Sequence, residues 1–577
     1  MLLSNLDLLA TAPGGVARLR ELILTLAVQG KLVPQDPADE PASVLLQKIR
    51  AEKDRLIAEG KSKRDKPLAE IAEEEKPFAL PQGWEWVRLF ELLPDFQNGA
   101  SSRGDVGGRP VTVLRLADIK NRRISLNDTR QIPIAESDIR KYQLREGDIL
   151  ITRVNGSADI VGQFNLCDTA VDAIYCDHFI RMRVSAQWVE PTFLTLLSES
   201  SLMRQRVKEL FITTAGQKTV NQGHIGSLRF ALPPLAEQSR IVTRVEELMR
   251  LCDALEAKGQ LEAAQHAQLV STLLGALTAS TTPEELADHW QRVAQHFDLL
   301  AGRPAAIDAL EQTLLQLAVR GLLVPQDPTD EPASALLQKI RTEKDRLIAT
   351  GHIKRDKPLP PVSDEEKPFE LPVGWEWARL GEVADNRLGK MLDKAKNTGK
   401  RYPYLRNTNV QWRHIELDDI KEISLEAGEL EEFRLLPGDL LICEGGYPGR
   451  CAIWNEPDLE MYFQKALHRV RPRGGVAVEL IAISLESDSK SGNLEQHFTG
   501  ATIKHFVGQA LDRYVIPLPP LPEQSRIVAR VTTLRRLCGD LRQRLAERQS
   551  VQARLAEALV ANNAQTSTQQ EDECHAA

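Results

Sequence analysis

Two groups of basic residues stand out in this sequence. Their residue types and spacing suit the binding of a polyanion. Each group mixes Lys and Arg with Gly and Asn, which suits a cationic loop that comes close to phosphates. The first group contains Arg103, Arg109, Arg115, Lys120, Arg122 and Arg123. The second contains Arg387, Lys390, Lys394, Lys396, Lys400 and Arg401. A single group of this kind is more often a solvated surface, so the organisation of the chain has to decide.

Further polar residues that could contact nucleic acid, some of them able to read the edges of bases, accompany both groups. Amide and basic side chains at such positions can form hydrogen bonds with bases in a groove. The first set contains Arg153, Asn155, Gln217, Lys218, Asn221 and Gln222. The second contains Arg406, Asn407, Asn409, Tyr447, Arg450 and Lys504. Together the sets favour nucleic-acid binding.

Motifs that would carry catalysis are missing from the sequence. There is no GxxxxGK[ST] phosphate loop, no HExxH metal motif, no convincing PD…(D/E)xK nuclease pattern and no [DNS]PP[YFW] run that could hold a flipped adenine. The histidines are isolated, and the 7 cysteines show no CxxC spacing, so we interpret them as reduced thiols. We therefore expect no catalytic centre, no cofactor and no metal site.

The same framework occurs twice along the chain. AVQGKLVPQDPADEPASVLLQKIRAEKDRLIAE at 27–59 recurs as AVRGLLVPQDPTDEPASALLQKIRTEKDRLIAT at 318–350, with 27 of 33 positions identical at an offset of 291. LPQGWEW and LPVGWEW follow these blocks, and LPPLAEQSRIV and LPPLPEQSRIV come later in each half. A period this long excludes a solenoid repeat. It indicates a pseudo-symmetric protein with two different binding domains, which suits the recognition of two unlike half-sites on one elongated ligand.

Long helices are predicted directly after each LPPL block, from about 235 to 275 and from 521 to 562. Pairs of prolines mark their starts, and apolar residues then step by four and three as in a coiled-coil seam. The seams contain Ile241, Val245, Leu248 and Cys252 in one helix and Ile527, Val531, Leu534 and Cys538 in the other. We interpret the two cysteines as apolar seam residues rather than a redox pair. The helices could form a spacer strut or an ordinary bundle core, and we expect the N-terminal helix to pack near the C-terminal one.

The segments between the repeated blocks, 84–231 and 375–518, are largely different in sequence but share a faint skeleton. VTVLRLADI (111–119) aligns with YPYLRNTNV (402–410), and REGDILITR (145–153) aligns with LPGDLLICE (436–444). These runs predict strands of one common fold that presents different surfaces. The formal net charge of the chain is −8, so any binding of nucleic acid has to rest on local groups.

The repeated LPxGWEW and LPPLxEQSRIV blocks, in this tandem arrangement, resemble the specificity subunit of Type I restriction-modification systems over essentially the whole chain. The resemblance implies an α+β protein, in which two pseudo-symmetric target recognition domains of mixed α/β type are separated by long antiparallel coiled-coil helices. It also implies a DNA-binding subunit without a catalytic centre of its own. Two departures from the family pattern are a long arm before the first LPxGW and a segment, 276–304, that has no counterpart before residue 14.

The resemblance and the repeats together divide the chain into alternating helical and mixed segments. We expect an N-terminal helical arm (1–62), a charged linker (63–83), the first target recognition domain (84–231), a central helical spacer (232–353), a second linker (354–374), the second target recognition domain (375–518), a C-terminal helix (519–565) and a disordered tail (566–577).

The partners that the resemblance implies are double-stranded DNA with a bipartite target, two methyltransferase subunits and motor/nuclease subunits. A cytoplasmic location is expected, because the N-terminus does not resemble a signal peptide and no apolar run is long enough to span a bilayer. Two alternatives stay open: a specificity subunit of a methylation-only system, and an assembly scaffold with degenerate readers.

Within the two recognition domains, equivalent residues are predicted to differ in role from variable ones. The pairs Arg115/Arg406 and Lys218/Lys504 occupy matching positions, so they are candidates for phosphate contacts or for the framework. Their variable neighbours are candidates for base readers: Asn155, Gln217, Asn221 and Gln222 in the first domain and Asn407, Asn409, Tyr447 and Arg450 in the second.

Overall fold

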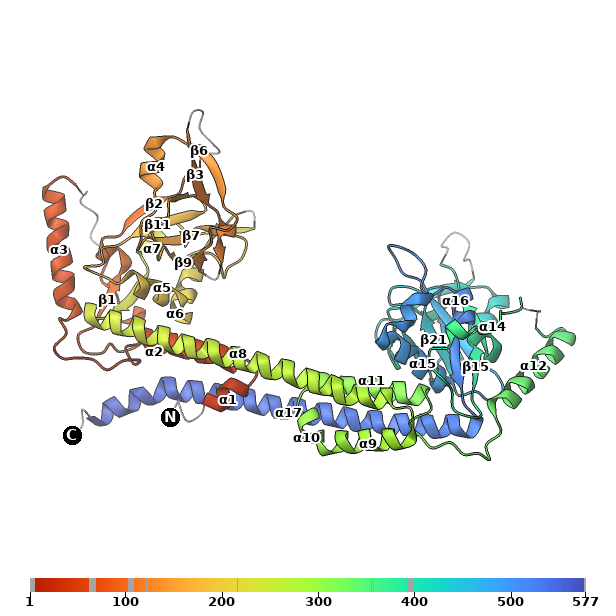
Figure 1. Ribbon diagram of the computed structural model, residues 1–577. Helices are drawn as coiled ribbons and strands as arrows, with labels where there is room; N and C mark the ends of the chain where they lie inside the picture. Colours follow the sequence, from red (N-terminus) through yellow and green to blue (C-terminus); the bar gives the residue numbers. More distant parts are fainter. Residues whose placement is uncertain are drawn as a thin grey trace. The chain divides into compact units, whose positions relative to one another are not determined.

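The computed structural model divides the chain into two compact units. Unit 1 comprises residues 1–262 and 549–577, and unit 2 comprises residues 263–548. The structure describes residues 6–61, 69–101, 108–120, 122–214, 216–353, 355, 357–392 and 399–574. Each unit contains one sheet-rich domain together with helices from distant parts of the sequence, so the fold is α+β, as expected (Figure 1).

Two long helices follow the LPPL blocks at the predicted positions. Helix α8 spans Leu235–Ala279 and has 45 residues, and helix α17 spans Leu521–Cys574 and has 54 residues. Both helices run further than the sequence suggested. The expected disordered tail, 566–577, is helical as far as Cys574, because no Pro or Gly follows Gly539 to end the helix.

Shorter helices from the repeated block at 27–59 and its surroundings complete each half. Unit 1 contains α1 (Leu6–Thr11), α2 (Gly15–Val28) and α3 (Ala42–Ala58). Unit 2 contains the counterparts α11 (Pro304–Val319) and α12 (Ala333–Ala349). We call α2 and α11 the arm helices.

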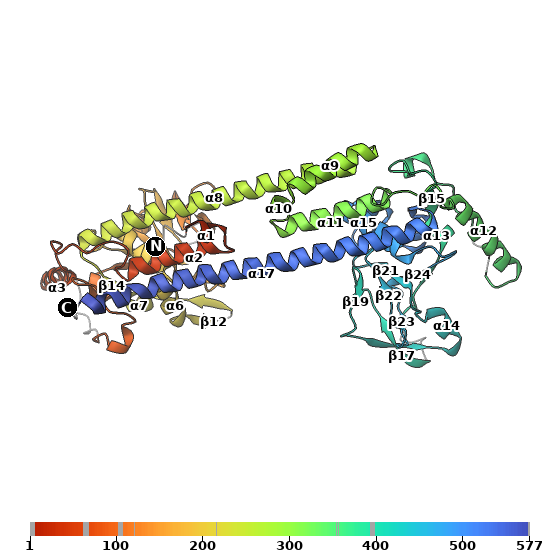
Figure 2. The same cartoon turned by 90° about the horizontal axis from the view of Figure 1, so that it is seen from below.

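Helix α2 lies between α8 and the last part of α17 in unit 1 (Figure 2). Arg20 binds Asp253 while Gln35 binds Glu237, so the arm runs antiparallel to α8. On its other side, Nη1 of Arg18 donates to the carbonyl oxygen of Ala553 at 2.5 Å. The expected packing of the N-terminal helix against the C-terminal one is therefore confirmed.

The apolar seam of each long helix faces the arm helix of its own unit. In unit 1 the buried seam residues Ile241, Val245 and Cys252 pack in one core with Leu19 and Ile23 of α2. In unit 2 the corresponding contacts join α17 and α11: Ile527 and Val531 pack with Leu315 and Val319, and Cys538 packs with Ile307 and Leu314. Leu248 and Leu534 are partly buried against these cores. Each seam is thus a contact between an arm helix and a long helix.

The sheet-rich domain of unit 1 consists of several small sheets. The central sheet has the order β2-β11-β7-β9, a second sheet has the order β10-β3-β6, and β1 pairs with β14. The strands of these sheets are β1 (Glu85–Arg88), β2 (Asp95–Asn98), β3 (Arg109–Leu114), β6 (Arg130–Ile134), β7 (Ile149–Thr152), β9 (Phe164–Leu166), β10 (Ala173–Tyr175), β11 (Phe179–Arg183) and β14 (Arg229–Leu232). Smaller pairings involve β4 (Ile119–Lys120), β5 (Arg123–Ile124), β8 (Val154–Asn155), β12 (Ile212–Thr214) and β13 (Gln217–Thr219). Its short helices are α4 (Glu136–Tyr142), α5 (Pro191–Glu199), α6 (Ser201–Glu209) and α7 (Gln222–Gly226).

The sheet-rich domain of unit 2 repeats this topology. Its central sheet has the order β16-β24-β21-β22, its second sheet has the order β20-β17-β23, and β15 pairs with β25. The strands are β15 (Glu376–Arg379), β16 (Ala384–Leu388), β17 (Lys400–Leu405), β18 (Val410–Gln411), β19 (His414–Ile415), β20 (Lys421–Leu425), β21 (Asp439–Cys443), β22 (Cys451–Trp454), β23 (Tyr462–Phe463), β24 (Leu467–Pro472) and β25 (Val515–Leu518). Its helices are α13 (Leu380–Val383), α14 (Leu430–Phe433), α15 (Val478–Ser491) and α16 (Gly508–Arg513).

The two domains agree in strand sense as well as in strand order. The second sheet combines one parallel pair with one antiparallel pair in both: β10 and β3 correspond to β23 and β17, and β3 and β6 correspond to β17 and β20. The two variable segments of the sequence therefore share one topology. We call them reading domain 1 and reading domain 2.

The segment without a counterpart, 276–304, forms helices α9 (Pro283–Gln295) and α10 (Phe297–Leu300). Val293 and Leu300 pack with Leu274 and Leu277 of α8 in one apolar cluster of unit 2. Among the described helices of the chain, none combines the length and the apolar character needed to cross a membrane.

Candidate nucleic-acid interface

A buried glutamate anchors each reading domain to its helices. In unit 1 the carboxylate of Glu237, which is 1% exposed, accepts hydrogen bonds from Nε1 of Trp84 at 2.9 Å and Nε2 of Gln35 at 3.2 Å. Burial raises the pKa of Glu237 above its ordinary value, although both hydrogen bonds act in the opposite direction. In unit 2 the same arrangement joins Glu523 to Trp375 at 3.0 Å and to Gln326 at 3.2 Å. We call Glu237 and Glu523 the anchor glutamates.

The next residues of the EQSR blocks extend this attachment. Gln238 accepts a hydrogen bond from the backbone N–H of Glu190 at 2.8 Å, and Arg240 pairs with Asp39 at 2.5 Å. In unit 2, Gln524 accepts from Ala477 at 2.8 Å, and Arg526 pairs with Asp330 at 2.7 Å. From the sequence, these blocks indicate the repeat, the helix starts and the family, but not these contacts. Their identity between the two repeats was the signal that they hold the reading domains in place.

Arg115 and Arg406 are bound into the framework of their domains. Arg115 binds the buried carboxylate of Asp118 through Nε and Nη2, both at 3.1 Å, and also the carbonyl oxygen of Asp128 at 2.7 Å. Arg406 repeats this geometry with Asn409 and Asp419. Asn409 itself is buried, and its amide donates to two backbone carbonyls. These contacts favour the framework role for both arginines, and they leave Asn409 turned away from any ligand.

In reading domain 1 the structure brings the polar set together around β8, β13 and α7. Lys218 lies opposite Asn155 in an antiparallel register, and its ammonium group donates to the carbonyl oxygen of Gly156 at 3.1 Å. Asn221 caps α7 by accepting from the N–H of His224 at 2.8 Å. Three further residues belong to the same region. Gln217 is exposed at the start of β13. Gln222 donates to Asn98 at 3.0 Å, and Arg153 donates to the carbonyl oxygen of Asp177 at 3.2 Å. We call six of these residues patch 1: Arg153, Asn155, Gln217, Lys218, Asn221 and Gln222.

A groove of about 650 Å³ lies beside patch 1 and is lined by Arg115, Arg130 and His178, among others. Cys176, Asp177 and His178 form the one group with metal-ligand chemistry found within the described ranges. Burial raises the pKa of the Cys176 thiol, which disfavours the thiolate that a metal would need.

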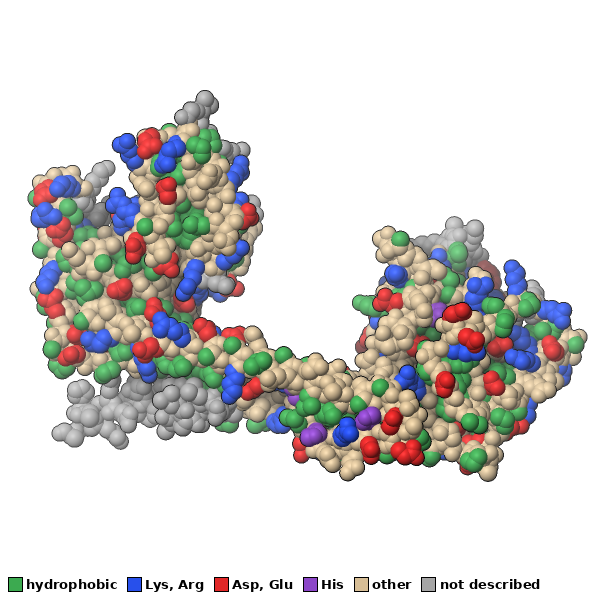
Figure 3. Space-filling model, in the orientation of Figure 1, with side chains coloured by type: hydrophobic (Ala, Val, Ile, Leu, Met, Phe, Trp, Pro, Cys, Tyr) green, Lys and Arg blue, Asp and Glu red, His purple; other side chains and the backbone are tan. Residues whose placement is uncertain are grey.

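The basic residues that are close in the first part of the sequence do not form a single cluster in space. Arg122 pairs with Glu199 at the end of α5 at 2.5 Å, and Arg109 lies 3.8 Å from Glu136 of α4. Lys120 and Arg123 pair across the β4–β5 hairpin, where both are exposed, and Arg103 lies outside the described residues. Figure 3 shows Lys and Arg side chains interspersed with Asp and Glu over both units in this view.

In reading domain 2 the structure groups Asn407, Tyr447 and Arg450. Nη2 of Arg450 donates to the carbonyl oxygen of Asn407 at 2.9 Å, and its guanidinium group lies 4.5 Å from the centre of the Tyr447 ring. Tyr447 is 68% exposed, so one face of this stacked pair is open to solvent. Lys504 is exposed next to His505, which pairs with the backbone of Gly445 in the same loop. We call these four residues patch 2: Asn407, Tyr447, Arg450 and Lys504.

The predicted basic loop of reading domain 2 is partly neutralised by acids. Arg387 pairs with Glu432, and Lys390 pairs with Glu429. Arg401 lies 3.6 Å from Glu422. Lys394 and Lys396 lie outside the described residues. Within the described part of this loop, Arg387 and Lys390 are thus paired with acids, whereas Lys400 and Arg401 stay exposed.

Comparison with known proteins gives a consistent result over nearly the whole chain. The model of the Type I restriction modification DNA specificity domain matches residues 112–265 and 372–548. The chain is 36% identical to the Type I restriction enzyme EcoAI specificity subunit of Escherichia coli over 94% of this chain and 93% of that protein. It is 35% identical to the Type I restriction enzyme EcoEI specificity subunit of the same species, over 94% of this chain and 93% of that protein.

A solved structure from work on complex assembly and conformational transition of the type I R-M system matches with a TM-score of 0.50 at 20% identity, covering 85% of this chain and 99% of that one. At this identity the likeness concerns the fold. The two matches of the family model fall on the two halves of the repeat, and the curated relatives extend over both. The chain belongs to the specificity subunits of Type I restriction-modification systems.

Proposed function

We propose that this chain is the DNA sequence-recognition subunit of a Type I restriction-modification complex, and that each reading domain recognises one half of a bipartite double-stranded site. The observation that carries the proposal is the repeated sheet order with unlike loops at corresponding positions. One fold presented twice fits two half-sites, and unlike loops fit two different sequences. We expect the half-sites to lie about one helical turn of DNA apart, so that both domains meet the major groove on the same side.

Patch 1 and patch 2 are the proposed reading surfaces. They are built at corresponding places, since β13 pairs with β8 in reading domain 1 and His505 bridges Gly445 in reading domain 2. Their side chains differ: patch 1 offers amides, whereas patch 2 offers an exposed Tyr–Arg stack. Amides suit adenine, and arginine suits guanine. The difference supports distinct half-sites for the two domains.

Lys218 and Lys504 are proposed to contact the phosphate backbone. A residue that two domains with different targets share is better suited to phosphates, which carry no sequence. Replacing Lys504 with Ala should weaken binding to specific and non-specific DNA alike and should lower the salt slope by about one. Replacing Asn221 should instead change the preferred half-site. Unchanged affinity and salt slope in both lysine variants would remove the phosphate role.

Two equivalent exposed leucines support the docking of two identical partner subunits. Leu251 of α8 and Leu537 of α17 are 54% and 48% exposed, and each directly precedes a buried seam cysteine. A single exposed leucine is ordinary by itself, and it is the equivalence of the two positions in the repeat that fits docking of the same partner. We assign these outward faces to adenine-N6 methyltransferase subunits, one in each half, and through them to the motor/nuclease subunits.

The decisive experiment maps N6-methyladenine across a host genome before and after disruption of this gene. Loss of methylation at one bipartite motif is expected, and unchanged methylation would overturn the proposal. Salt-dependent, sequence-selective binding by the purified complex separates this function from an assembly scaffold with degenerate readers. Restriction of unmodified DNA in the same host separates it from a methylation-only system.

A further inference from the structure

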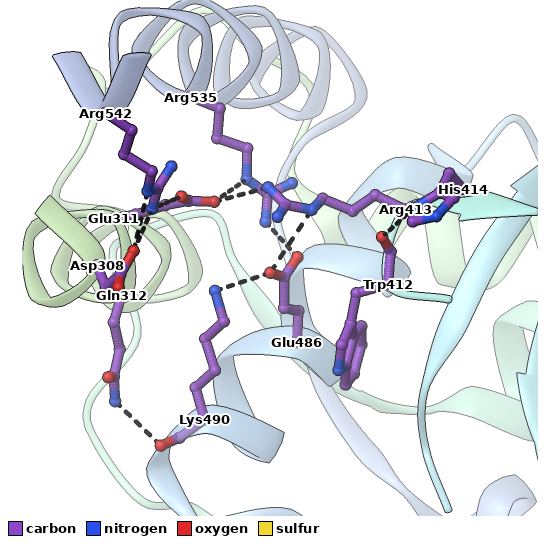
Figure 4. Close-up of polar contacts among 10 residues, drawn as sticks. All are labelled: Asp308, Glu311, Gln312, Trp412, Arg413, His414, Glu486, Lys490, Arg535 and Arg542. Atoms are coloured by element: carbon purple, nitrogen blue, oxygen red, sulfur yellow. Dashed lines mark hydrogen bonds and ion pairs between the residues drawn. The ribbon is translucent and has the colours of Figure 1, made fainter. Parts of the chain in front are cut away.

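A buried network of ion pairs joins the arm helix, the long helix and the reading domain of unit 2 (Figure 4). Two acids lie at its centre, Glu311 of α11 and Glu486 of α15, and both are 1% exposed. Glu311 accepts from Nη2 of Arg542 at 2.5 Å and from Nη1 of Arg413 at 2.7 Å, and Glu486 pairs with Arg535. Arg413 comes from the β18–β19 turn, so the network also ties the reading domain to the arm. Burial alone would raise the pKa of Glu311, but the hydrogen bond from Arg542 and the nearby cations hold it below its ordinary value.

Unit 1 contains the corresponding pair with its charges reversed. At the offset of 291, the position of Glu311 is occupied by Arg20, and at the offset of 286, the position of Arg542 is occupied by Glu256. Arg20 binds Glu256 at 3.2 Å and Asp253 at 2.6 Å. The positive charge thus lies on the arm helix in unit 1 and on the long helix in unit 2.

Several contacts between the arms and the long helices are the same in both halves and cannot distinguish them, unlike the Arg18–Ala553 contact of unit 1 and the Asp308–Arg542 pair of unit 2. The anchor glutamates, their Trp and Gln partners and the Arg–Asp pairs are the same residues in both halves. The seam residues Ile241, Val245 and Cys252 also have identical counterparts in α17. On these contacts alone, α2 of one chain could take the place of α11 in a second copy.

We propose that the reversed polarity of these ion pairs selects the partner of each arm helix, so that two copies of this chain do not exchange their arms. In an exchanged arrangement Arg20 would lie against Arg535 and Arg542. Glu311 would lie against Asp253 and Glu256. Both exchanged contacts bring like charges together. Arg20 would then lie at the buried position of Glu311, whereas Asp253 and Glu256 are 68% and 56% exposed, so the repulsion that disfavours the wrong pairing is strongest in unit 2.

The test uses two full-length chains that carry different affinity tags. They are unfolded together in urea and refolded by dilution, one tag is captured, and the amount of the second tag in the captured fraction measures arm exchange. Light scattering gives the mass of the refolded species, and circular dichroism gives its helix content. The wild type should refold with little co-capture.

Two variants separate selection from simple loss of an ion pair. Arg20→Glu repels its own partners and attracts those of α11, so co-capture should rise about tenfold, which corresponds to about 1.4 kcal/mol of lost discrimination. The triple variant Arg20→Glu, Asp253→Arg, Glu256→Arg keeps its own pair complementary but gives both halves the same polarity. It should fold with normal helix content and still exchange more than the wild type.

The control reverses an exposed pair within one helix, Glu343→Arg with Arg346→Glu, and should refold like the wild type. If Arg20→Glu does not refold, the triple variant alone provides the test. Wild-type co-capture in the well-folded triple variant would overturn the proposal, because like polarity in both halves would then carry no penalty. Equal co-capture in the control and in the triple variant would overturn it as well.

Discussion

Replacing the anchor glutamate Glu237 with Gln should loosen the attachment of reading domain 1 to its helices. Two donors converge on this carboxylate, Nε1 of Trp84 at 2.9 Å and Nε2 of Gln35 at 3.2 Å. A glutamine has one acceptor oxygen, so one of the two donors would face an NH₂ group. A buried donor left without a partner costs about 1–3 kcal/mol. Opening of the attachment should therefore become more frequent by roughly five- to 150-fold.

Hydrogen exchange followed by mass spectrometry measures this opening in peptides that cover the start of α8. The repeat supplies a control within the same molecule, because Glu523 has the same two partners and remains unchanged in the variant. Faster exchange is expected at the start of α8 and not at the start of α17. Combining Glu237→Gln with Trp84→Phe should cost less than the sum of the two changes, since the unsatisfied donor is removed. Unchanged exchange in Glu237→Gln would refute the role of the anchor.

Further predictions concern the seam, the patches and pH. Replacing Ile527 and Val531 with Asp places unpaired charge in the seam and should lower the free energy of unfolding by several kcal/mol. Assembly, measured by co-purification, should be lost, and methylation of DNA should be lost with it. Lys218→Ala should weaken DNA binding irrespective of sequence, whereas Arg450→Ala should cost about 1–3 kcal/mol on the original half-site only, as measured by titration with matched and altered duplexes. Burial raises the pKa of Glu523 in the folded state above its value in the unfolded state. The stability that the protonated Glu523 contributes is therefore fully present below the unfolded-state pKa, and it is lost as the pH rises through the folded-state pKa. Opening at the start of α17 should increase over that window, and a Glu523→Gln variant should lack this dependence.

The sequence by itself determined the repeat, the helix starts and the family. These features depend on local information: prolines end or begin helices, apolar residues repeat with the helical period, and identical blocks can be aligned without coordinates. It also predicted one fold for two dissimilar segments, and the equal strand order of the two domains agrees with this. Lys218 and Asn155 are 63 residues apart in the sequence, and the structure pairs them directly across two strands.

Only the tertiary structure decided which charges are available to a ligand and which serve the framework. Arg122 and Arg123 are neighbours in the sequence, yet Arg122 pairs with Glu199 of α5 while Arg123 stays exposed. Glu237 lies in the first turn of a helix, and its carboxylate is buried against Trp84, 153 residues away in the chain. Whether a charged side chain meets water, a partner or a buried donor depends on segments that packing brings together, and spacing along the chain does not specify those contacts.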